Sequence, residues 1–579
     1  MLVATMYITR TKKIVGTKIY RSILLVKSIR KNGVPRHETI LNLTKWNEKH
    51  IVILERALKG QESDLNPNTG SNSLPNANKL TNTSSDQETN NLNNLADIEV
   101  GTGKSIGGIL AITHLAKKLG IESALGTTKQ AKLAMVLIAG RLLTQGSRLK
   151  LCEWQGMNEI EAVMGISKYT ENELYHTLDW LSKNQAKIET RLFKHRYEAT
   201  QKKPILFLYD ITSSYMEGQE NELAKYGYNR DGKKGKKQIV IGLLTDQEGT
   251  PVSVEVFEGN RSDSTTVIAQ VEKMASRFGV TELVLVGDKG MIKRTQIDAF
   301  KENTHYITTI TRSQIQSLVK EGVFQLSLFD NDLLEIVHEG IRYVLRKNPL
   351  RAREIQSQRQ ERLDYLSTQI ILANTYLKTH PKAKVSIQLT KLENRLKKLL
   401  LSSFCTIKIG IADTLNTVEA KERQLYLVVD ESKRIELAQL DGCYVLKTDV
   451  IKEVLSTQQV HDRYKDLAKV ESAFRAIKTG CLEIRPVYVR KDSRTRGHVF
   501  VTMLSYMIAQ SFSTAIKPLH LPANLAWDYV DQLQTTTLSF KELSVKKIQT
   551  PTSKCAAIFN AIGLKIPNLS FRTDLRPVV

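Results

Sequence analysis

Cysteine is scarce in this 579-residue chain, and long apolar runs are missing from it. The five cysteines are scattered, odd in number and never spaced as Cys-x-x-Cys, so the sequence predicts neither a disulfide framework nor a zinc site. No stretch approaches the roughly 18 uninterrupted apolar residues that a membrane-spanning helix needs. The opening MLVATMYITRTKK holds too short an apolar run for a signal peptide. We therefore expect a cytoplasmic protein with no membrane partner.

Acidic residues are also outnumbered. The chain has 84 Lys and Arg against 60 Asp and Glu, a net charge of +24. So large a basic excess favours a polyanionic partner, and nucleic acid is the usual one. A hydrophobic share of 41% is enough for real cores, and the length predicts several modules.

Two aspartates each come at the end of a short apolar run typical of a buried strand. Asp210 follows residues 204–209, and Asp288 follows residues 283–287. Two further β-type runs and a helical pattern lie between them. The predicted order is that of an RNase H-like domain, in which a mixed five-stranded sheet with helices gathers carboxylates at one edge. The predicted fold class is therefore multidomain α/β.

A third acid, Glu471, lies much later, on a predicted helix that runs to Gly480. Tyr464, Glu471 and Lys478 are spaced by seven, so they share one stripe of that helix. An apolar stripe beside them can seat the helix on a core, and ordinary amphipathicity alone would also explain the pattern.

Three carboxylates that converge repel one another unless cations lie between them. Hard oxygen ligands suit Mg²⁺ or Mn²⁺. Two such ions, roughly 4 Å apart, can activate a water or hydroxyl and stabilise the leaving oxygen of a phosphodiester. We expect Asp210, Asp288 and Glu471 to be the catalytic residues and the ligands of two ions.

The chain resembles transposases of bacterial insertion sequences, in the branch of the DDE superfamily with a Tyr-x2-Arg-x3-Glu-x6-Lys signature. Tyr464, Glu471 and Lys478 stand at matching places, but Leu467 occupies the signature arginine position. Further likeness lies in YDITSSY at 209–215, KQIVIGL at 237–243, EGN at 258–260 and GDKGM at 287–291.

This resemblance implies an enzyme that binds the terminal inverted repeats of its element, cleaves the ends with metal-activated water and joins the 3′-hydroxyl ends to target DNA. The implied partners are double-stranded DNA and a second copy of the chain in a homodimer that pairs two ends. The implied location is the bacterial nucleoid.

Several cationic or aromatic residues are candidates for DNA contact. Tyr464 and Lys478 are the signature positions, and Arg475, one turn past Glu471, is a substitute for the missing arginine. The cluster before an apolar helix adds further candidates, which are Arg494, Arg496 and His498. The alternative for His498 is a satisfied core histidine.

Other acids in the same region are weaker ligand candidates. Asp246 lies beside a hairpin turn, where aspartate is common for backbone reasons. Asp263 is placed to cap the next helix, and Glu258 ends a strand.

The sequence divides into seven predicted segments. They are a small β-rich N-terminal unit at 1–60, a disordered polar linker at 61–95, a helical DNA end-binding region at 96–200, the first part of the RNase H-like core at 201–316, a β-rich insertion with helices at 317–448, the second part of the core at 449–516 and a C-terminal helical tail at 517–579. A helical scaffold is the alternative for 96–200.

Two other functions stay open at this stage. An RNase H-like nuclease or resolvase would cleave DNA without strand transfer. A DNA-binding repressor derived from a transposase would need no metal site, and an intact set of three acids argues against it.

Overall fold

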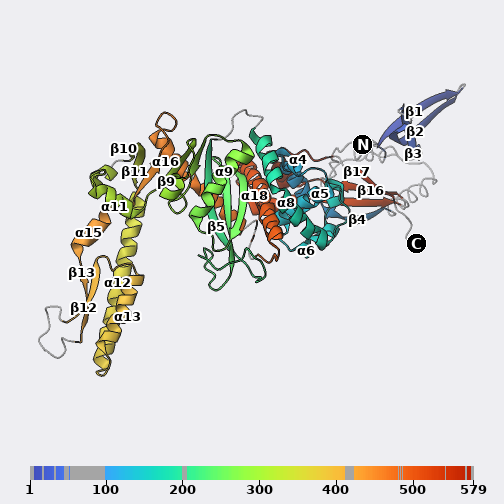
Figure 1. Cartoon of the computed structure of the whole chain (residues 1–579). Helices are drawn as coiled ribbons and strands as arrows, with labels where there is room; N and C mark the ends of the chain where they lie inside the picture. The colour runs from blue at the N-terminus through green and yellow to red at the C-terminus, as the bar shows by residue number, and fades with distance from the viewer. Residues whose placement is uncertain are drawn as a thin grey trace, which may run out of the picture. The chain divides into compact units, whose positions relative to one another are not determined.

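The computed structural model describes most of the chain outside the predicted polar linker (Figure 1). The described residues are 6–15, 18–31, 34–44, 51, 98–197, 205–330, 332–410, 423–479, 482, 484, 487–540, 543–567 and 570–574. They form two units, one of residues 104–534 and 549–565, the other of residues 1–103, 535–548 and 566–579. The predicted linker at 61–95 lies outside the described residues.

A sheet that has eight strands in the described residues is the centre of the larger unit. The first strands along the chain are β5 (Leu206–Tyr215), β6 (Gln238–Asp246), β7 (Pro251–Glu258), β8 (Leu283–Val286) and β9 (Thr304–Thr309). β5 runs antiparallel to β6 and parallel to β8, β7 pairs antiparallel with β6, and β9 pairs parallel with β8. The 3₁₀ turn η1 (Asp263–Thr266) and helix α9 (Val267–Phe278) separate β7 from β8. The predicted order of strands and helix is confirmed.

The sheet is longer than the five strands predicted from the sequence. Strands β10 (Leu334–His338), β11 (Ile341–Lys347) and β14 (Cys443–Thr448) extend it beyond β9, with β14 pairing antiparallel to β9. All three strands fall within the predicted separate insertion. The alternation of apolar and polar residues identifies these segments as strands. Which sheet they join is decided by tertiary pairing.

The rest of the predicted insertion is a helical hairpin with a small sheet. Helices α12 (Pro349–Thr379) and α13 (Val385–Lys398) pack together and against strands β12 (Cys405–Ile409) and β13 (Leu425–Val429). Helix α15 (Glu431–Gln439) leads back to β14. Leu363, Leu366 and Ile370 of α12 are buried at helical spacing against Leu392 and Leu396 of α13. This cluster gives the hairpin a core of its own.

Helices surround a long central helix, α18 (Asp492–Ile516), in the larger unit (Figure 1). The helices before the sheet are α3 (Gly107–Lys118), α4 (Ile121–Leu125), α5 (Lys129–Leu143), α6 (Arg148–Met157), α7 (Ile160–Met164) and α8 (Glu171–Tyr197). α18 contacts α3, α5, α8 and β7. Its length and composition would allow it to cross a membrane, but 67% of its apolar window is buried inside the protein. It is therefore a core helix, which joins the helical region to the sheet.

Thr170 caps α8. The Glu173 backbone N–H donates to Thr170 Oγ1 at 3.4 Å, and the Thr170 N–H donates to Glu173 Oε2 at 2.9 Å. This reciprocal pair satisfies two backbone donors and fixes where the helix begins.

The smaller unit contains two sheets. Strands β1 (Met6–Val15), β2 (Lys18–Lys31) and β3 (Val34–Asn42) form an antiparallel meander, in agreement with the predicted N-terminal β unit. The second sheet has the order β17 (Ser570–Asp574), β16 (Leu543–Ile548), β15 (Gln534–Phe540) and β4 (Ile98–Ser105). β4 thus begins the predicted helical region as a strand.

The C-terminal tail differs from the helical tail predicted at 517–579. Helices α19 (Ala523–Asp531) and α20 (Ser553–Ile562) are present, but β15, β16 and β17 lie between and after them. The β-branched run Thr535–Thr537 favours a strand, and β16 and β4 provide its partners.

Candidate active site

Asp210 and Asp288 lie on neighbouring parallel strands. Leu208 of β5 is paired with Val286 of β8. Asp210 and Asp288 each follow this pair by two residues, and the charge of Asp288 acts on Asp210, so the two acids lie near each other. Asp210 is half-buried within β5, whereas Asp288 is exposed just beyond the end of β8.

Backbone donors hold the Asp288 carboxylate. Its Oδ1 accepts the Gly290 N–H at 2.9 Å and the Met291 N–H at 3.0 Å. A Cβ at Gly290 would lie 3.2 Å from Asp288 Oδ1, so a glycine keeps this approach open. Met291 and Ile292 are buried and anchor the turn in the core. The GDKGM segment therefore positions an acid at the sheet edge.

Glu471 comes from helix α17 (Leu467–Lys478), which packs against β5. Val470, Ala473, Phe474 and Ile477 form the buried face of α17, whereas Glu471 is exposed. The apolar stripe predicted from the sequence thus seats the helix.

The three carboxylates lie within electrostatic range of one another. The pKa of Asp210 is raised to about 7, chiefly by burial, and the charges of Asp288 and Glu471 contribute to this rise. The Ile211 N–H, which donates to Asp210 Oδ1 at 2.8 Å, and the Arg230 guanidinium oppose this rise in the pKa. Folding therefore gathers negative charge at this edge of the sheet.

The donor set fits a hard divalent cation. Among the described residues, none of the Asp210, Asp288 and Glu471 carboxylates forms an ion pair with Lys or Arg, although the chain carries a net charge of +24. Carboxylate oxygens of this kind suit Mg²⁺ or Mn²⁺. In the described part of the chain, no three Asp, Glu, His or Cys side chains are gathered closely enough to hold one ion by themselves. The acids are thus neighbours, but they do not form a closed metal cage.

Tyr464 lies on a separate helix, in contrast to the single helix predicted through Tyr464, Glu471 and Lys478. Helix α16 (Thr457–Lys465) ends before Asp466, and α17 begins after it. The Asp466 carboxylate binds Arg463 at 3.2 Å and Lys469 at 3.0 Å, which stabilises the turn between the helices.

The Tyr464 hydroxyl nevertheless lies close to the acids. It is 3.3 Å from Thr309 Oγ1, and burial raises its pKa, with the charges of Asp288, Glu471 and Asp210 raising it further.

The two cationic candidates on α17 have different environments. Lys478 Nζ forms an ion pair with Asp231 Oδ1 at 2.9 Å, inside the protein. Arg475 is exposed and has no ion pair with a described acid. Of the two, Arg475 is therefore the better placed for a phosphate.

The cations before the apolar helix contact protein groups. Arg494 Nε binds Asp179 at 3.0 Å, and Arg496 donates to the Val256 carbonyl at 2.6 Å. His498 is buried, and its Nδ1 accepts from Arg148 at 2.8 Å. Burial, then the charges of Arg148 and Arg141, holds its pKa well below the usual value. These contacts agree with a packing role, and we do not extend the DNA contact to these three residues.

The alternative acids have structural partners or lie apart. Asp246 binds Arg196 at 2.9 Å and accepts the Thr250 N–H at the predicted turn. Asp263 does not cap a helix with its side chain. Its Oδ1 and Oδ2 accept hydrogen bonds from Arg230 Nη2, at 2.9 and 2.7 Å. Glu258 is exposed at the end of β7.

Arg230 and Asp231, in the loop between β5 and β6, are not among the residues predicted from the sequence. In this loop the sequence indicates a basic run at 233–237, for which a solvated turn and a contact to DNA are the two interpretations. Arg230 and Asp231 precede this basic run. The sequence feature that marks them is an Arg-Asp pair among turn residues.

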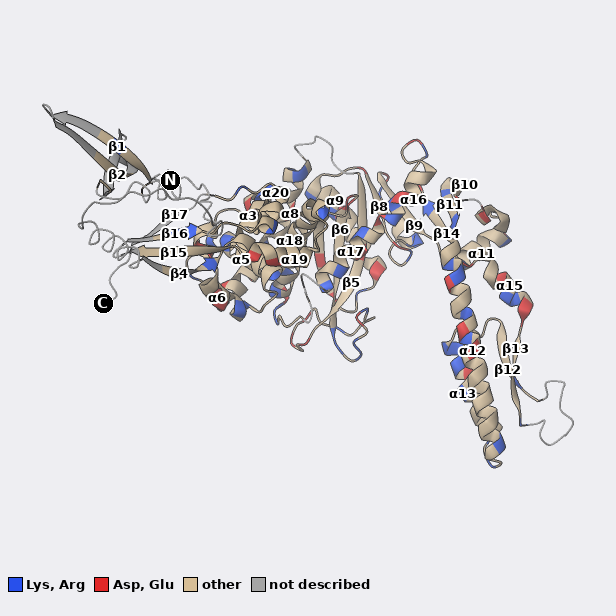
Figure 2. Cartoon of the chain, turned by 180° about the vertical axis from the view of Figure 1, so that it is seen from behind, with Lys and Arg blue, Asp and Glu red and all other residues tan. Residues whose placement is uncertain are grey.

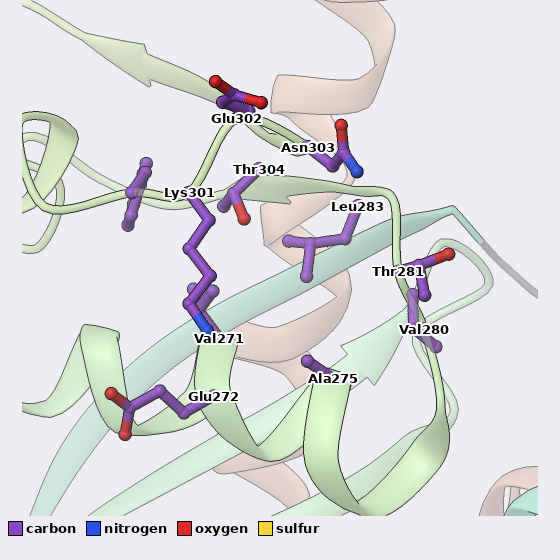
Figure 3. Close-up of a pocket in the computed structure, with 11 residues that line it drawn as sticks. Val271, Glu272, Ala275, Val280, Thr281, Leu283, Lys301, Glu302, Asn303 and Thr304 are labelled. Atoms are coloured by element: carbon purple, nitrogen blue, oxygen red, sulfur yellow. The ribbon is translucent and has the colours of Figure 1, made fainter.

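A cavity of about 510 Å³ lies elsewhere (Figure 3). Leu283 and Thr304, paired residues at the starts of β8 and β9, line it together with Val271 and Phe300. The cavity is therefore at the opposite end of these strands from Asp288. It lacks converging acids and is not the candidate active site.

Two family models match the chain. The model described as "Transposase DDE domain" matches residues 201–508, which is more than half of the chain. The model described as "IS1634 family transposase, N-terminal domain" matches residues 8–70. No curated protein matches the chain. The first match includes all three acids.

Proposed function

The chain belongs to the DDE transposase family, and from this premise we propose that it binds the terminal inverted repeats of an insertion sequence, cleaves them by metal-assisted phosphodiester hydrolysis and joins the 3′-hydroxyl ends to target DNA. The proposal is supported by the position of Asp210 and Asp288 on neighbouring parallel strands, by the charges of Asp288 and Glu471 that act on Asp210, and by the lack of basic partners for these acids among the described residues. An acidic centre binds cations, and the basic surface of the rest of the protein attracts DNA phosphates.

We assign β5–β9 and their helices as an RNase H-like core. The order β7-β6-β5-β8-β9 supports this assignment, since the first three strands are antiparallel and the last two continue in parallel. β14, β11 and β10 are an extension of that core, and α12 and α13 are carried on the extension.

Asp210, Asp288 and Glu471 would hold two Mg²⁺ or Mn²⁺ ions. Such ions, when bound, activate a water or a 3′-hydroxyl and stabilise the leaving oxygen. With a pKa of about 7, the Asp210 carboxyl would be only partly ionised near neutral pH without metal, and bound cations would favour its carboxylate form. The backbone N–H groups of Gly290 and Met291 keep the Asp288 carboxylate oriented throughout.

Other residues position the DNA. The Tyr464 hydroxyl, beside the acids, and the exposed Arg475, one turn beyond Glu471, are placed to bind phosphates next to the scissile one. Lys478 acts through Asp231, because its ammonium group is engaged there. A homodimer would present two such sites, one for each end of the element.

End cleavage with purified protein tests the proposal. A labelled duplex carrying one element end is incubated with Mg²⁺, and the products are mapped to the nucleotide on each strand. Nicks at the element boundary followed by joined products support transposition. Nicks without joining would support a nuclease, and binding without any cleavage would support a repressor.

Asp288→Asn is the matched variant for this assay. Asparagine keeps Oδ1, which accepts from Gly290 and Met291, so the turn is preserved while the charge is lost. Cleavage should disappear and end binding should persist. Loss of both together would contradict the assignment.

A further inference from the structure

Three strongly exposed aromatic side chains belong to one part of the fold. They are Tyr228, Tyr488 and Tyr226, with exposed fractions of 82%, 69% and 66%. Tyr226 and Tyr228 lie on the loop between β5 and β6, and Tyr488 follows Val487, which forms a bridge with Met216 at the start of that loop. We call these three residues the tyrosine surface. Aromatic rings left in water at one place indicate a binding surface.

The backbone that presents these rings is well anchored. Met216 and Val487 form a parallel bridge, and Asn221 Nδ2 donates to the Val489 carbonyl at 3.0 Å from a buried position. Gln238 Nε2 donates to the Tyr228 carbonyl at 3.1 Å. The tyrosine positions are therefore set by the fold.

The tyrosine surface borders the candidate catalytic acids. The Arg230 guanidinium lies 5.7 Å from the centre of the Tyr228 ring and binds Asp263 through two hydrogen bonds. A Cβ built on Gly290 would be 3.2 Å from Asp288 Oδ1 and 3.7 Å from Asp263 Oδ2. Tyr228, Arg230 and Asp263 thus form a continuous path to Asp288.

Lysines recur on the loop that carries two of these tyrosines, and Figure 2 colours Lys and Arg blue along the chain. Lys233, Lys234, Lys236 and Lys237 follow Tyr228 on the same loop, and the Lys233 ammonium lies 5.8 Å from the Tyr215 ring centre. A lysine-rich loop that also exposes aromatic rings is the composition that binds unpaired nucleic acid, because bases stack on the rings while cations hold the backbone. A duplex keeps its bases stacked inside and would use the lysines alone.

We propose that the tyrosine surface binds unpaired bases of DNA by stacking, next to the phosphodiester at the catalytic acids. The inference rests on the proposed function, since cleavage at an element end exposes DNA strands at this place. It adds a binding site for single-stranded DNA that involves no metal ligand.

Fluorescence anisotropy in EDTA tests the surface. The probes are a labelled 15-nucleotide oligothymidylate and a labelled duplex of the same length. The Tyr226→Ala/Tyr228→Ala double variant should bind the single strand about ten-fold more weakly, or worse, and the duplex within about two-fold of wild type. Unchanged single-strand affinity would overturn the proposal.

Phenylalanine provides the matched control. Tyr226→Phe/Tyr228→Phe keeps both rings and should bind the single strand as wild type does, and a loss equal to that of the alanine variant would overturn stacking. Lys233→Ala/Lys234→Ala should weaken single-strand and duplex binding alike. Because all these side chains are exposed, the variants are expected to fold.

Two further measurements distinguish base stacking from a protein interface and from the proposed transposition. Light scattering shows whether the alanine variant changes self-association, and a shift from dimer to monomer would overturn the proposal in favour of a protein interface. End cleavage by wild-type protein is measured in parallel. If wild-type protein cleaves the end normally but single-strand binding does not depend on the tyrosines, the inference alone is overturned. If cleavage is absent but single-strand binding depends on the tyrosines, the proposed transposition is overturned and the tyrosine surface is supported.

Discussion

The Lys478 ammonium lies 2.9 Å from Asp231 Oδ1, and the two side chains are only 12% and 2% exposed. Asp231 Oδ2 also accepts the Tyr215 N–H at 3.1 Å. The lysine at the signature position therefore ties helix α17, which carries Glu471, to β5 and to the loop that follows it. We propose that Lys478 positions elements of the site.

Lys478→Met should destabilise the fold. The substitution leaves the Asp231 carboxylate buried without its cation, which typically costs about 3–5 kcal/mol. Urea unfolding followed by circular dichroism measures this free energy. Lys469→Met is the control, because Lys469 is more exposed, and it should cost less than about 1 kcal/mol. Equal costs for the two variants would contradict a positioning role.

Arg475→Ala should weaken DNA binding and leave stability unchanged. Arg475 is exposed one turn from Glu471, so it can bind a phosphate without supporting the core. Removing one phosphate contact reduces the slope of log affinity against log salt by about 1. Anisotropy titrations of end duplex at several salt concentrations measure that slope, with the neighbouring exposed Ser472→Ala as control. An unchanged slope would exclude Arg475 from the phosphate contacts.

Asp210 should make stability depend on pH in the absence of metal. Its pKa of about 7 in the folded protein lies above the ordinary 3.8, so the folded state keeps the proton longer than the unfolded one. The free energy of unfolding therefore falls as the pH rises from about 4 to about 7, by at most about 4 kcal/mol, and then levels off.

Thermal melts in EDTA between pH 4.5 and 8 measure this effect. Asp210→Asn should melt higher than wild type at pH 8 and close to it at pH 4.5. Added Mn²⁺ should raise the melting temperature of wild type at pH 8 and affect the variant less. If the melting temperatures of the two proteins changed with pH in the same way across the whole range, the elevated pKa of Asp210 would be contradicted.

His498 should act on stability in the opposite direction. Its folded-state pKa lies below that of the unfolded chain, so its contribution is complete above about pH 6.5 and is lost as the pH falls. His498→Gln, which keeps an acceptor for Arg148, should unfold with a shallower pH dependence between pH 7 and 5, by up to about 1.4 kcal/mol per pH unit. Its affinity for end duplex at pH 7.5 should equal that of wild type. Reduced affinity without any stability change would restore a DNA role.

Much of the candidate site could be predicted from local sequence. Asp210 and Asp288 each follow an apolar strand-like run, and these runs belong to the neighbouring parallel strands β5 and β8, although β5 continues past Asp210 to Tyr215. Glu471 was recognisable by its spacing from Tyr464 and Lys478. The decoy Asp246 was identified because turn chemistry already explained it.

The remaining features depend on contacts between distant segments. Nothing near Lys478 indicates that Asp231 will bind it, and nothing near Arg494 indicates Asp179. The pairing of Leu446 with Thr309, which lengthens the sheet, is likewise a tertiary choice. The break at Asp466 is not predictable from the spacing, because a seven-residue spacing can continue across a short turn as it does along one helix. Local patterns specify elements, and their partners are chosen by packing.

Metal binding tests the central claim most directly. Electron paramagnetic resonance of Mn²⁺ titrated into the protein with an end duplex counts bound ions without relying on activity. We predict about two bound ions for wild type, and fewer for Asp210→Asn, Asp288→Asn and Glu471→Gln. Glu258→Gln is the control and should match wild type. Mn²⁺ binding that is the same in all these proteins would contradict the assignment of Asp210, Asp288 and Glu471 as the catalytic centre.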